Sequence, residues 1–234
     1  MENTHVLQRI KAGLIVSCQA LDSEPLHSAF IMGRMAAAAE EGGAVAIRAN
    51  SPEDIMEIRN TVKLPVIGLY KVVYSDSEVY ITPTMAEVDA LYQTGAEIIA
   101  LDATARSRPG GVTLDAFFRE VRAKYPDQLF MADTSCLEEG LQAEVLGFDL
   151  VATTMAGYTP YTKGKSLPDY ALMKEYVERL HVPIIAEGGI WTPEQLRTSL
   201  DTGVWAAVVG TAITRPQTIT RRFVESIRPR LQEE

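Results

Sequence analysis

Short apolar runs alternate with longer, mixed stretches along the whole chain. The short runs are rich in Val, Ile, Leu and Ala, and the mixed stretches carry apolar residues at helical spacing. Such alternation predicts repeated βα units around a parallel sheet. Eight runs have the length and composition of buried strands: 14–18, 44–47, 66–70, 98–101, 129–132, 150–153, 184–186 and 206–209. Because eight such strands close a barrel, the sequence predicts an α/β fold of the (β/α)8, or TIM barrel, type.

Helix-start signals support this division of the chain. Capping residues, some followed by proline or an acidic residue, occur at 51–54, 84, 113, 168–169 and 192–194. No linker, low-complexity segment or shift in composition interrupts the pattern. Residues 1–234 are therefore expected to form a single barrel domain.

The last two predicted strands both end in glycine. Glycine lets the backbone approach a ligand closely and offer N–H groups to an anion. Adjacent glycine-bearing ends of the last two strands form the phosphate site of many (β/α)8 barrels. The predicted phosphate ligands are Gly188, Gly189, Gly210, Thr211 and Arg215.

Polar residues end the predicted strands, where barrel enzymes place their chemistry. They are Gln19, Arg48, Lys71, Asp102, Asp133, Thr154, Glu187 and Arg215. Strands three and seven lie opposite each other in a ring of eight, so Lys71 and Glu187 should face each other across the mouth. A lysine and a carboxylate on two sides of a carbon suit removal of a proton from one face and its return to the other. This pair is the predicted catalytic set.

Lysine is a poor base at its ordinary pKa, so this role requires a lower pKa in the site. Burial and the cations Arg48 and Arg215 would lower the pKa of Lys71, whereas Glu187 would raise it. The sequence does not decide which effect prevails.

The remaining strand-end residues are predicted to bind substrate. Arg48 suits a substrate oxygen or carboxylate, with an ion pair to Asp102 or Asp133 as the alternative. Gln19 and Asp133, on opposite strands, suit hydrogen bonds to sugar hydroxyls, and Thr154 completes the set. The loop 102–109 adds two cations, Arg106 and Arg108, which we expect to position the loop or face solvent, and the part that Asp102 plays stays open.

Composition excludes several classes of function. A formal net charge of −9 over 234 residues argues against a nucleic-acid partner. Two cysteines without metal-ligand spacing suggest a reducing compartment, and no targeting or membrane-spanning run is present, so a cytoplasmic protein is expected. The three histidines fall away from strand ends, and no metal or added cofactor is predicted.

The strand ends together resemble one family. The relevant runs are GLIVSCQ (13–19), AVAIR (44–48), VIGLYK (66–71), VYIT (79–82), IIALDAT (98–104), ATTMAGYT (152–159), IIAEGGI (184–190) and VVGTAITRP (208–216). In this order they are similar to the N-acetylmannosamine-6-phosphate 2-epimerases of bacterial sialic acid catabolism, which are barrels of the ribulose-phosphate-binding type.

That resemblance implies interconversion of N-acetylmannosamine 6-phosphate and N-acetylglucosamine 6-phosphate without an added cofactor. It places the catalytic lysine at Lys71 and the active-site glutamate at Glu187, with sugar ligands at Gln19, Arg48 and Asp133 and the phosphate site as above. Val72 departs from the family, which often has a basic residue directly after the lysine.

Two other functions are compatible with the same residues. A strand-end lysine also begins Schiff-base aldolase and lyase reactions on phosphosugars. A phosphosugar-binding sensor would need the glycines and Arg215 but not Lys71 opposite Glu187. The sequence allows a homodimer without settling the oligomeric state, and the connection 155–167 could be a lid or a mobile loop.

Overall fold

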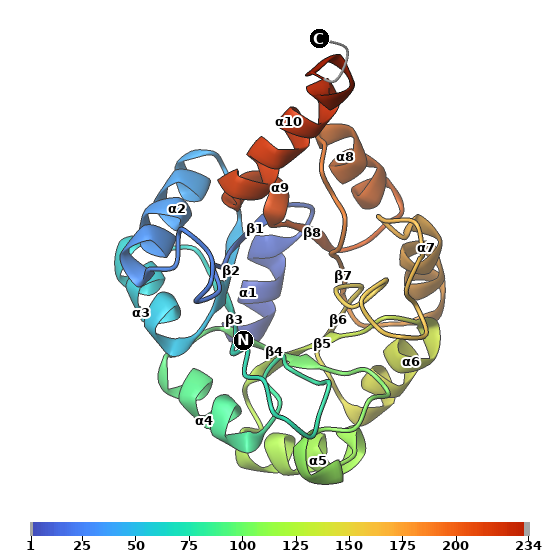
Figure 1. Ribbon diagram of the computed structural model, residues 1–234. Helices are drawn as coiled ribbons and strands as arrows, with labels where there is room; N and C mark the ends of the chain where they lie inside the picture. The colour runs from blue at the N-terminus through green and yellow to red at the C-terminus, as the bar shows by residue number, and fades with distance from the viewer. Residues whose placement is uncertain (1, 232–234) are drawn as a thin grey trace.

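Eight parallel strands form a closed barrel in the computed structural model, which describes residues 2–231. Each strand pairs with its neighbours in sequence, and β8 pairs with β1. Figure 1 shows the strands at the centre and the helices in a ring around them. The strands are β1 (Leu14–Cys18), β2 (Ala46–Asn50), β3 (Val66–Leu69), β4 (Ile98–Asp102), β5 (Leu129–Asp133), β6 (Leu150–Ala152), β7 (Ile184–Ala186) and β8 (Ala206–Val209). The predicted barrel is confirmed; residues 1 and 232–234 of the predicted domain lie outside the described part.

The helices begin where the capping residues predict. Thr84 and Thr192 each form a capping box, and Ser51, Thr113 and Asp169 accept hydrogen bonds from first-turn N–H groups. The helices are α1 (Glu2–Ile10), α2 (Ala29–Glu41), α3 (Pro52–Thr61), α4 (Met85–Gln93), α5 (Leu114–Lys124), α6 (Leu137–Leu146), α7 (Tyr170–Arg179), α8 (Pro193–Asp201), α9 (Thr211–Thr214) and α10 (Pro216–Leu231), with a 3₁₀ turn, η1 (Pro109–Gly111).

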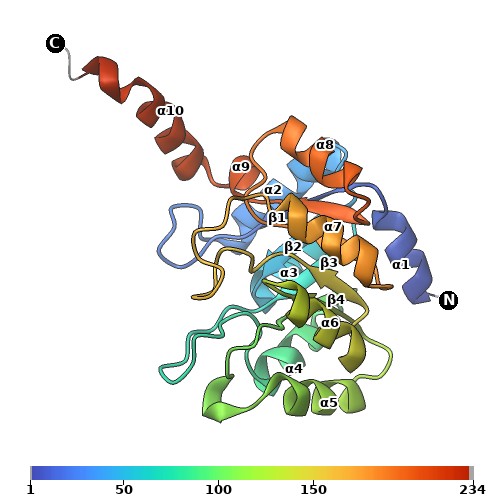
Figure 2. The same ribbon diagram turned by 90° about the vertical axis from the view of Figure 1, so that its right-hand side faces the viewer.

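The two ends of the barrel differ. Helix α1, which the sequence pattern did not predict, lies at the N-terminal end of the strands, where Val6 and Ile10 join the inner core. The indole N–H of Trp205 donates to the carbonyl of Leu7 at 2.8 Å and fixes this helix. The long connections leave the opposite end (Figure 2). The C-terminal end of the strands is therefore open to a ligand.

Strand β2 is the one clear misplacement in the prediction. The expected run was 44–47, but the strand is Ala46–Asn50, and Arg48 lies in its middle rather than at its end. The prediction took Arg48, a polar residue, to mark the end of the buried strand. The strand continues through Arg48 because the cation is paired inside the barrel, as described below.

Alternation along the strands places the site. Apolar residues that point into the barrel form an inner core, and those that point outward pack under the helices. On β3, Ile67 and Leu69 point into the barrel, and Lys71, two residues further along, points to the same side and lines the cavity. On β5, Met131 is followed in this way by Asp133. Polar residues thus form the top layer of an otherwise apolar barrel.

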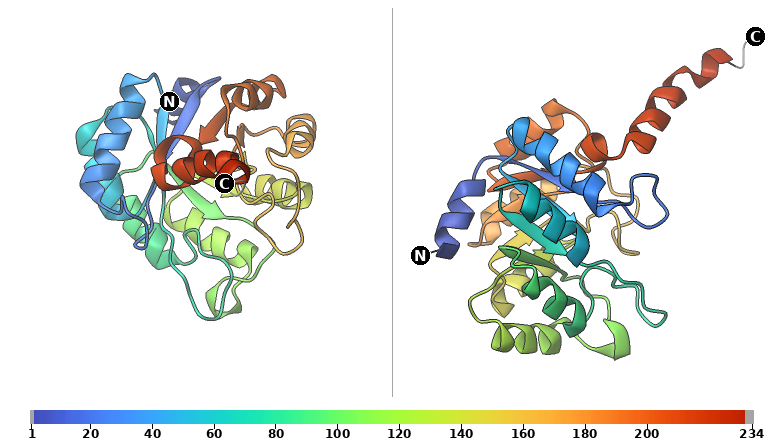
Figure 3. Two further views of the ribbon diagram at one scale, coloured as in Figure 1. Left: turned by 45° about the horizontal axis from the view of Figure 1, so that its top comes forward. Right: turned by 90° about the vertical axis from the view of Figure 1, so that its left-hand side faces the viewer.

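Helix α10 leaves the barrel instead of packing along it. Figure 3 shows it projecting beyond the other helices. Phe223, Val224 and Ile227 on this helix are 72%, 42% and 47% exposed. Between residues 2 and 231, no helix combines the length and apolar character needed to cross a membrane.

Candidate active site

A cavity of about 1030 Å³ opens at the C-terminal ends of the strands. The predicted residues that line it are Gln19, Arg48, Lys71, Thr154, Glu187, Gly188, Gly189, Gly210, Thr211 and Arg215. Asp133 lies beneath its floor and is fully buried. The structure therefore brings the whole predicted set to one end of the barrel.

Arg48 is the centre of a buried ionic network. Its guanidinium makes two hydrogen bonds to the Asp133 carboxylate, at 3.0 and 2.5 Å, and lies 3.1 Å from Oε2 of Glu187. Thr154 Oγ1 is within hydrogen-bond distance of both carboxylates, 2.6 Å from Asp133 and 3.2 Å from Glu187. Of the two ion pairs considered for Arg48, the structure contains the one with Asp133, and it adds Glu187.

Glu187 holds its proton more tightly than an exposed glutamate does. Burial raises the pKa of this carboxyl, and Asp133 raises it further, while Arg48 opposes the change. The backbone N–H of Glu187 donates to Thr153 Oγ1 at 3.0 Å, which fixes the end of β7. A protonated Glu187 could donate a proton, and its ionised form could accept one.

Lys71 lies at the end of β3, opposite β7 in the ring. Its backbone N–H donates to Asn50 Oδ1 at 2.8 Å, and its Nζ donates to Gln19 Oε1 at 2.8 Å. Burial lowers the pKa of Lys71 to about 8, helped by Arg48 and Arg215 and opposed by Glu187. The balance that the sequence left open therefore favours a lysine that can act as a base near neutral pH.

The predicted phosphate ligands lie together after β7 and β8. Gly188 and Gly189 have φ values of 109° and 73°, which favour glycine, and a side chain at Gly189 would collide with Leu167. Gly210 precedes α9. These positions present backbone to the cavity rather than side chains.

Arg215 has a partner that the sequence did not reveal. Its guanidinium lies 3.0 Å from Oε2 of Glu24, which also accepts a hydrogen bond from the N–H of Leu21, and Oε1 of Glu24 accepts one from Gln217. Glu24 follows β1 in a connection that carries two carboxylates, with Asp22 as the other. Nothing in the spacing distinguishes the two. Position in a strand-end loop was the only available signal.

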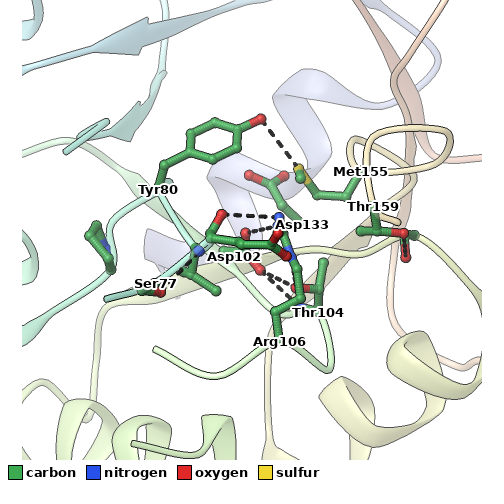
Figure 4. A network of polar contacts seen from close by, with 12 residues as sticks. Ser77, Tyr80, Asp102, Thr104, Arg106, Asp133, Met155 and Thr159 are labelled. Atoms are coloured by element: carbon green, nitrogen blue, oxygen red, sulfur yellow. Dashed lines mark hydrogen bonds and ion pairs between the residues drawn. The ribbon is translucent and has the colours of Figure 1, made fainter. Parts of the chain in front are cut away.

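The two arginines of the loop after β4 are bonded to the protein rather than solvated. Arg106 pairs with Asp102 at 2.7 Å and donates to the carbonyl of Glu78 at 3.0 Å (Figure 4). Arg108 donates to the carbonyls of Thr82, Pro83 and Asp102. Both arginines therefore fasten this loop to the connection 71–82, which agrees with a positioning role and excludes a solvated one.

The connection 155–167 also begins as an ordered segment. Met155 N–H donates to the carbonyl of Thr134, and the hydroxyls of Thr159 and Thr162 lie 2.6 Å apart in the protein interior. Tyr158 lines the cavity and is 60% exposed. Its first part is thus a fixed wall of the site.

Across the described residues, no group of three or more His, Cys, Asp or Glu could hold a metal ion.

Known proteins share this sequence and fold. Residues 32–229 match the family model described as "Putative N-acetylmannosamine-6-phosphate epimerase". A relative with that description, specified as a 2-epimerase, from Caldanaerobacter subterraneus is 56% identical over 225 residues, 96% of this chain and 95% of its own. A second, from Clostridium perfringens, is 55% identical over 223 residues, 95% of this chain and all of its own.

Solved structures agree with the sequence comparison. That of the N-acetylmannosamine-6-phosphate 2-epimerase from Clostridium perfringens has a TM-score of 0.90 at 56% identity and covers 94% of this chain and 96% of that one. A thiamine phosphate pyrophosphorylase from Pyrococcus furiosus, with a TM-score of 0.62 at 21% identity over 94% of this chain and 98% of its own, shares the fold alone. The match in sequence, fold and length shows that the chain belongs to the N-acetylmannosamine-6-phosphate epimerase family.

Proposed function

We propose that this enzyme interconverts N-acetylmannosamine 6-phosphate and N-acetylglucosamine 6-phosphate. One observation carries the proposal beyond family membership. Lys71, with a pKa lowered to about 8, and Glu187, with a raised pKa, come from opposite strands and line the same cavity. Two groups adjusted in this way can exchange a proton with a carbon that lies between them.

The reaction follows from the chemistry of the open-chain sugar. C2 is next to the C1 aldehyde, so removal of its proton gives an enediolate whose charge is shared with O1. Neutral Lys71 would take this proton on one face, and Glu187, in its protonated form, would supply one on the other. The reverse reaction exchanges these roles. Inversion of C2 needs no oxidant, so the residues present are sufficient for it.

The other site residues would act in two ways. We propose that Gly188, Gly189, Gly210, Thr211 and Arg215 bind the 6-phosphate, because backbone N–H groups and a guanidinium both suit that anion. Gln19, Arg48, Asp133 and Thr154 would set the positions of Lys71 and Glu187, since each is bonded within this network. The buried Nε of Arg48 has no hydrogen-bond partner among the described residues, which leaves a donor for a substrate oxygen.

Proton NMR in D₂O tests this function directly. With N-acetylmannosamine 6-phosphate as substrate, the product should carry deuterium at C2. Product that retains its original proton in full would refute the enediolate route. Borohydride-dependent labelling of Lys71 would indicate the Schiff-base lyase instead.

Variants locate the chemistry. Lys71→Ala should lower kcat by about 10²- to 10⁴-fold, the usual range for a general acid–base group, with substrate binding largely kept. Lys63→Ala, which removes an exposed lysine, is the matched control and should leave kcat unchanged. Full activity in Lys71→Ala would remove Lys71 from the mechanism.

We further propose that the enzyme is a homodimer that associates through α10. Phe223, Val224 and Ile227 are exposed on a helix that projects from the barrel, which is costly unless another surface covers them. The same helix carries Arg221, Arg222 and Arg228 in a chain of net charge −9, so a second acidic copy suits it. Sedimentation velocity should show a dimer that Phe223→Asp dissociates. A monomeric wild type would refute this assembly.

We also propose a cytoplasmic location. Both Cys18 and Cys136 are free thiols, as expected in a reducing compartment. Fractionation of cells that produce the protein should recover it with cytoplasmic markers.

A further inference from the structure

The cavity has an apolar wall that the proposed chemistry does not use. It is formed by Tyr80 and Ile81 from the connection 71–82 and by Met155 after β6. Ile81 and Met155 are 2% and 1% exposed, so their positions are fixed by packing. Tyr80 and Ile81 lie over β3 and β4, which are opposite β7 and β8 in the ring, and Met155 adjoins Tyr80 from the end of β6. The cavity therefore has a phosphate end and an apolar end.

Tyr80 supplies a polar group in this wall. Its hydroxyl is 3.9 Å from Met155 Sδ (Figure 4), and a thioether is a weak acceptor. By contrast, Lys71 already donates to the side chain of Gln19. Burial raises the pKa of Tyr80, so its O–H remains a donor at neutral pH. A ligand carbonyl would replace the sulfur with a much better acceptor.

The substrate has a group that matches this wall. In the proposed function on which this inference rests, the phosphate is on C6 and the acetamido group on C2, next to the reacting bond. Phosphate bound after β7 and β8 leaves the C1–C2 end directed at the opposite wall. An acetamido group offers one strong acceptor, its carbonyl oxygen, and one methyl group.

We infer that Tyr80 donates its hydroxyl proton to the acetamido carbonyl, while Ile81 and Met155 enclose the methyl group. The wall is then a subsite that selects N-acetylated hexosamine phosphates. A sugar with a hydroxyl at C2 would leave the apolar side chains facing a polar group. An N-acyl chain longer than acetyl would collide with Met155.

Tyr80 is attached to the catalytic lysine through the backbone. Lys71 and Ile81 form an antiparallel bridge, and Val72 N–H donates to the carbonyl of Tyr80 at 3.0 Å. Arg106 holds this hairpin by its bond to the carbonyl of Glu78. Recognition of the acetamido group and the base that acts on C2 thus belong to one rigid unit, so the subsite can also orient the C2 proton toward Lys71.

Binding by calorimetry tests the inference with two ligands and two enzymes. Tyr80→Phe should weaken binding of N-acetylglucosamine 6-phosphate by about 5- to 50-fold, the usual effect of losing a hydrogen bond that also leaves a partner unpaired. Binding of glucose 6-phosphate, which has a hydroxyl at C2, should change by less than about twofold, since it makes no such bond. Tyr92→Phe, on α4 and outside the cavity, should affect neither ligand.

A second variant tests the methyl site. Met155→Ala should raise kcat/KM for the N-propanoyl analogue relative to the N-acetyl substrate, with thermal unfolding as the check that the barrel is intact. Equal losses for both ligands in Tyr80→Phe, or an unchanged preference in Met155→Ala, would overturn the subsite. A wild type that binds both phosphates but leaves the C2 proton in place would refute the proposed function instead. If the wild type epimerises normally and Tyr80→Phe binds both ligands as the wild type does, only the subsite is refuted.

Discussion

The pH dependence of catalysis should report the pKa of Lys71. The neutral amine is the base, and kcat/KM follows the ionisation of the free enzyme. Burial and two cations lower this pKa from 10.5 to about 8. We therefore predict that kcat/KM is bell-shaped in pH: loss of the proton from Lys71, with a pKa of about 8, raises it, and loss of the proton from Glu187 lowers it. The second ionisation of the substrate phosphate, near pH 6, falls below this limb.

The size of the effect follows from the two pKa values. At pH 7, a lysine with a pKa of about 8 is roughly 9% neutral, whereas one at 10.5 is roughly 0.03% neutral. The site thus provides about 300 times more base than an exposed lysine would. A measured limb near pH 10 would mean that the burial and charges described here do not act on Lys71.

Two charge variants test the cause of the shift. Arg215→Gln removes a cation that lowers the pKa of Lys71, so the limb should move to higher pH. Glu187→Gln removes a carboxylate that raises it, so the limb should move to lower pH, read from the residual C2 exchange in D₂O. Arg119→Gln, at an exposed ion pair on α5, is the control. Movement of both limbs in one direction would refute the electrostatic account.

Three further predictions concern phosphate, stability and metals. Arg215→Ala should raise KM strongly for N-acetylmannosamine 6-phosphate and leave turnover of the unphosphorylated sugar almost unchanged; an equal penalty for both would show that Arg215 does not bind phosphate. Arg48→Met should lower the free energy of unfolding, measured by urea titration, by about 3–5 kcal/mol, because Asp133 and Glu187 lose their cation. Arg59→Met, at a partly exposed ion pair, should lower it by less than about 1 kcal/mol. Dialysis against EDTA should leave the rate unchanged, and recovery of a lost rate with Mg²⁺, Mn²⁺ or Zn²⁺ would reveal a metal requirement.

The alternation of the strands made most of the architecture predictable. Each strand has a two-residue period, so the residue that follows the last buried apolar position on the inner face is fixed in space. This is why Lys71 and Thr154 could be placed at the barrel mouth from sequence alone. Capping residues such as Thr84 and Thr192 fixed the helix starts for a similar local reason.

Pairing between distant residues was only partly predictable. Arg48 and Asp133 are 85 residues apart, and the sequence offered their ion pair only as an alternative, beside one with Asp102, so Arg48 was taken as the end of β2. Glu24 was missed because its bond to Arg215 depends on the path of the loop after β1. The donor groups of Arg106 and Arg108 are used on backbone carbonyls, which leave no mark in a sequence.

The closure of the barrel joins the two extremes of the chain and so constrains the order in which it can assemble. Leu14 pairs with Ala207, and Trp205 holds α1 through the carbonyl of Leu7, 198 residues away. On the ribosome, β1 has no partner on one edge until the last strand has been synthesised. Contacts of such long range form slowly, and open strand edges expose a growing chain to aggregation. A ribosome that stalls before β8 would therefore present an open sheet, with α1 lacking the tryptophan that anchors it.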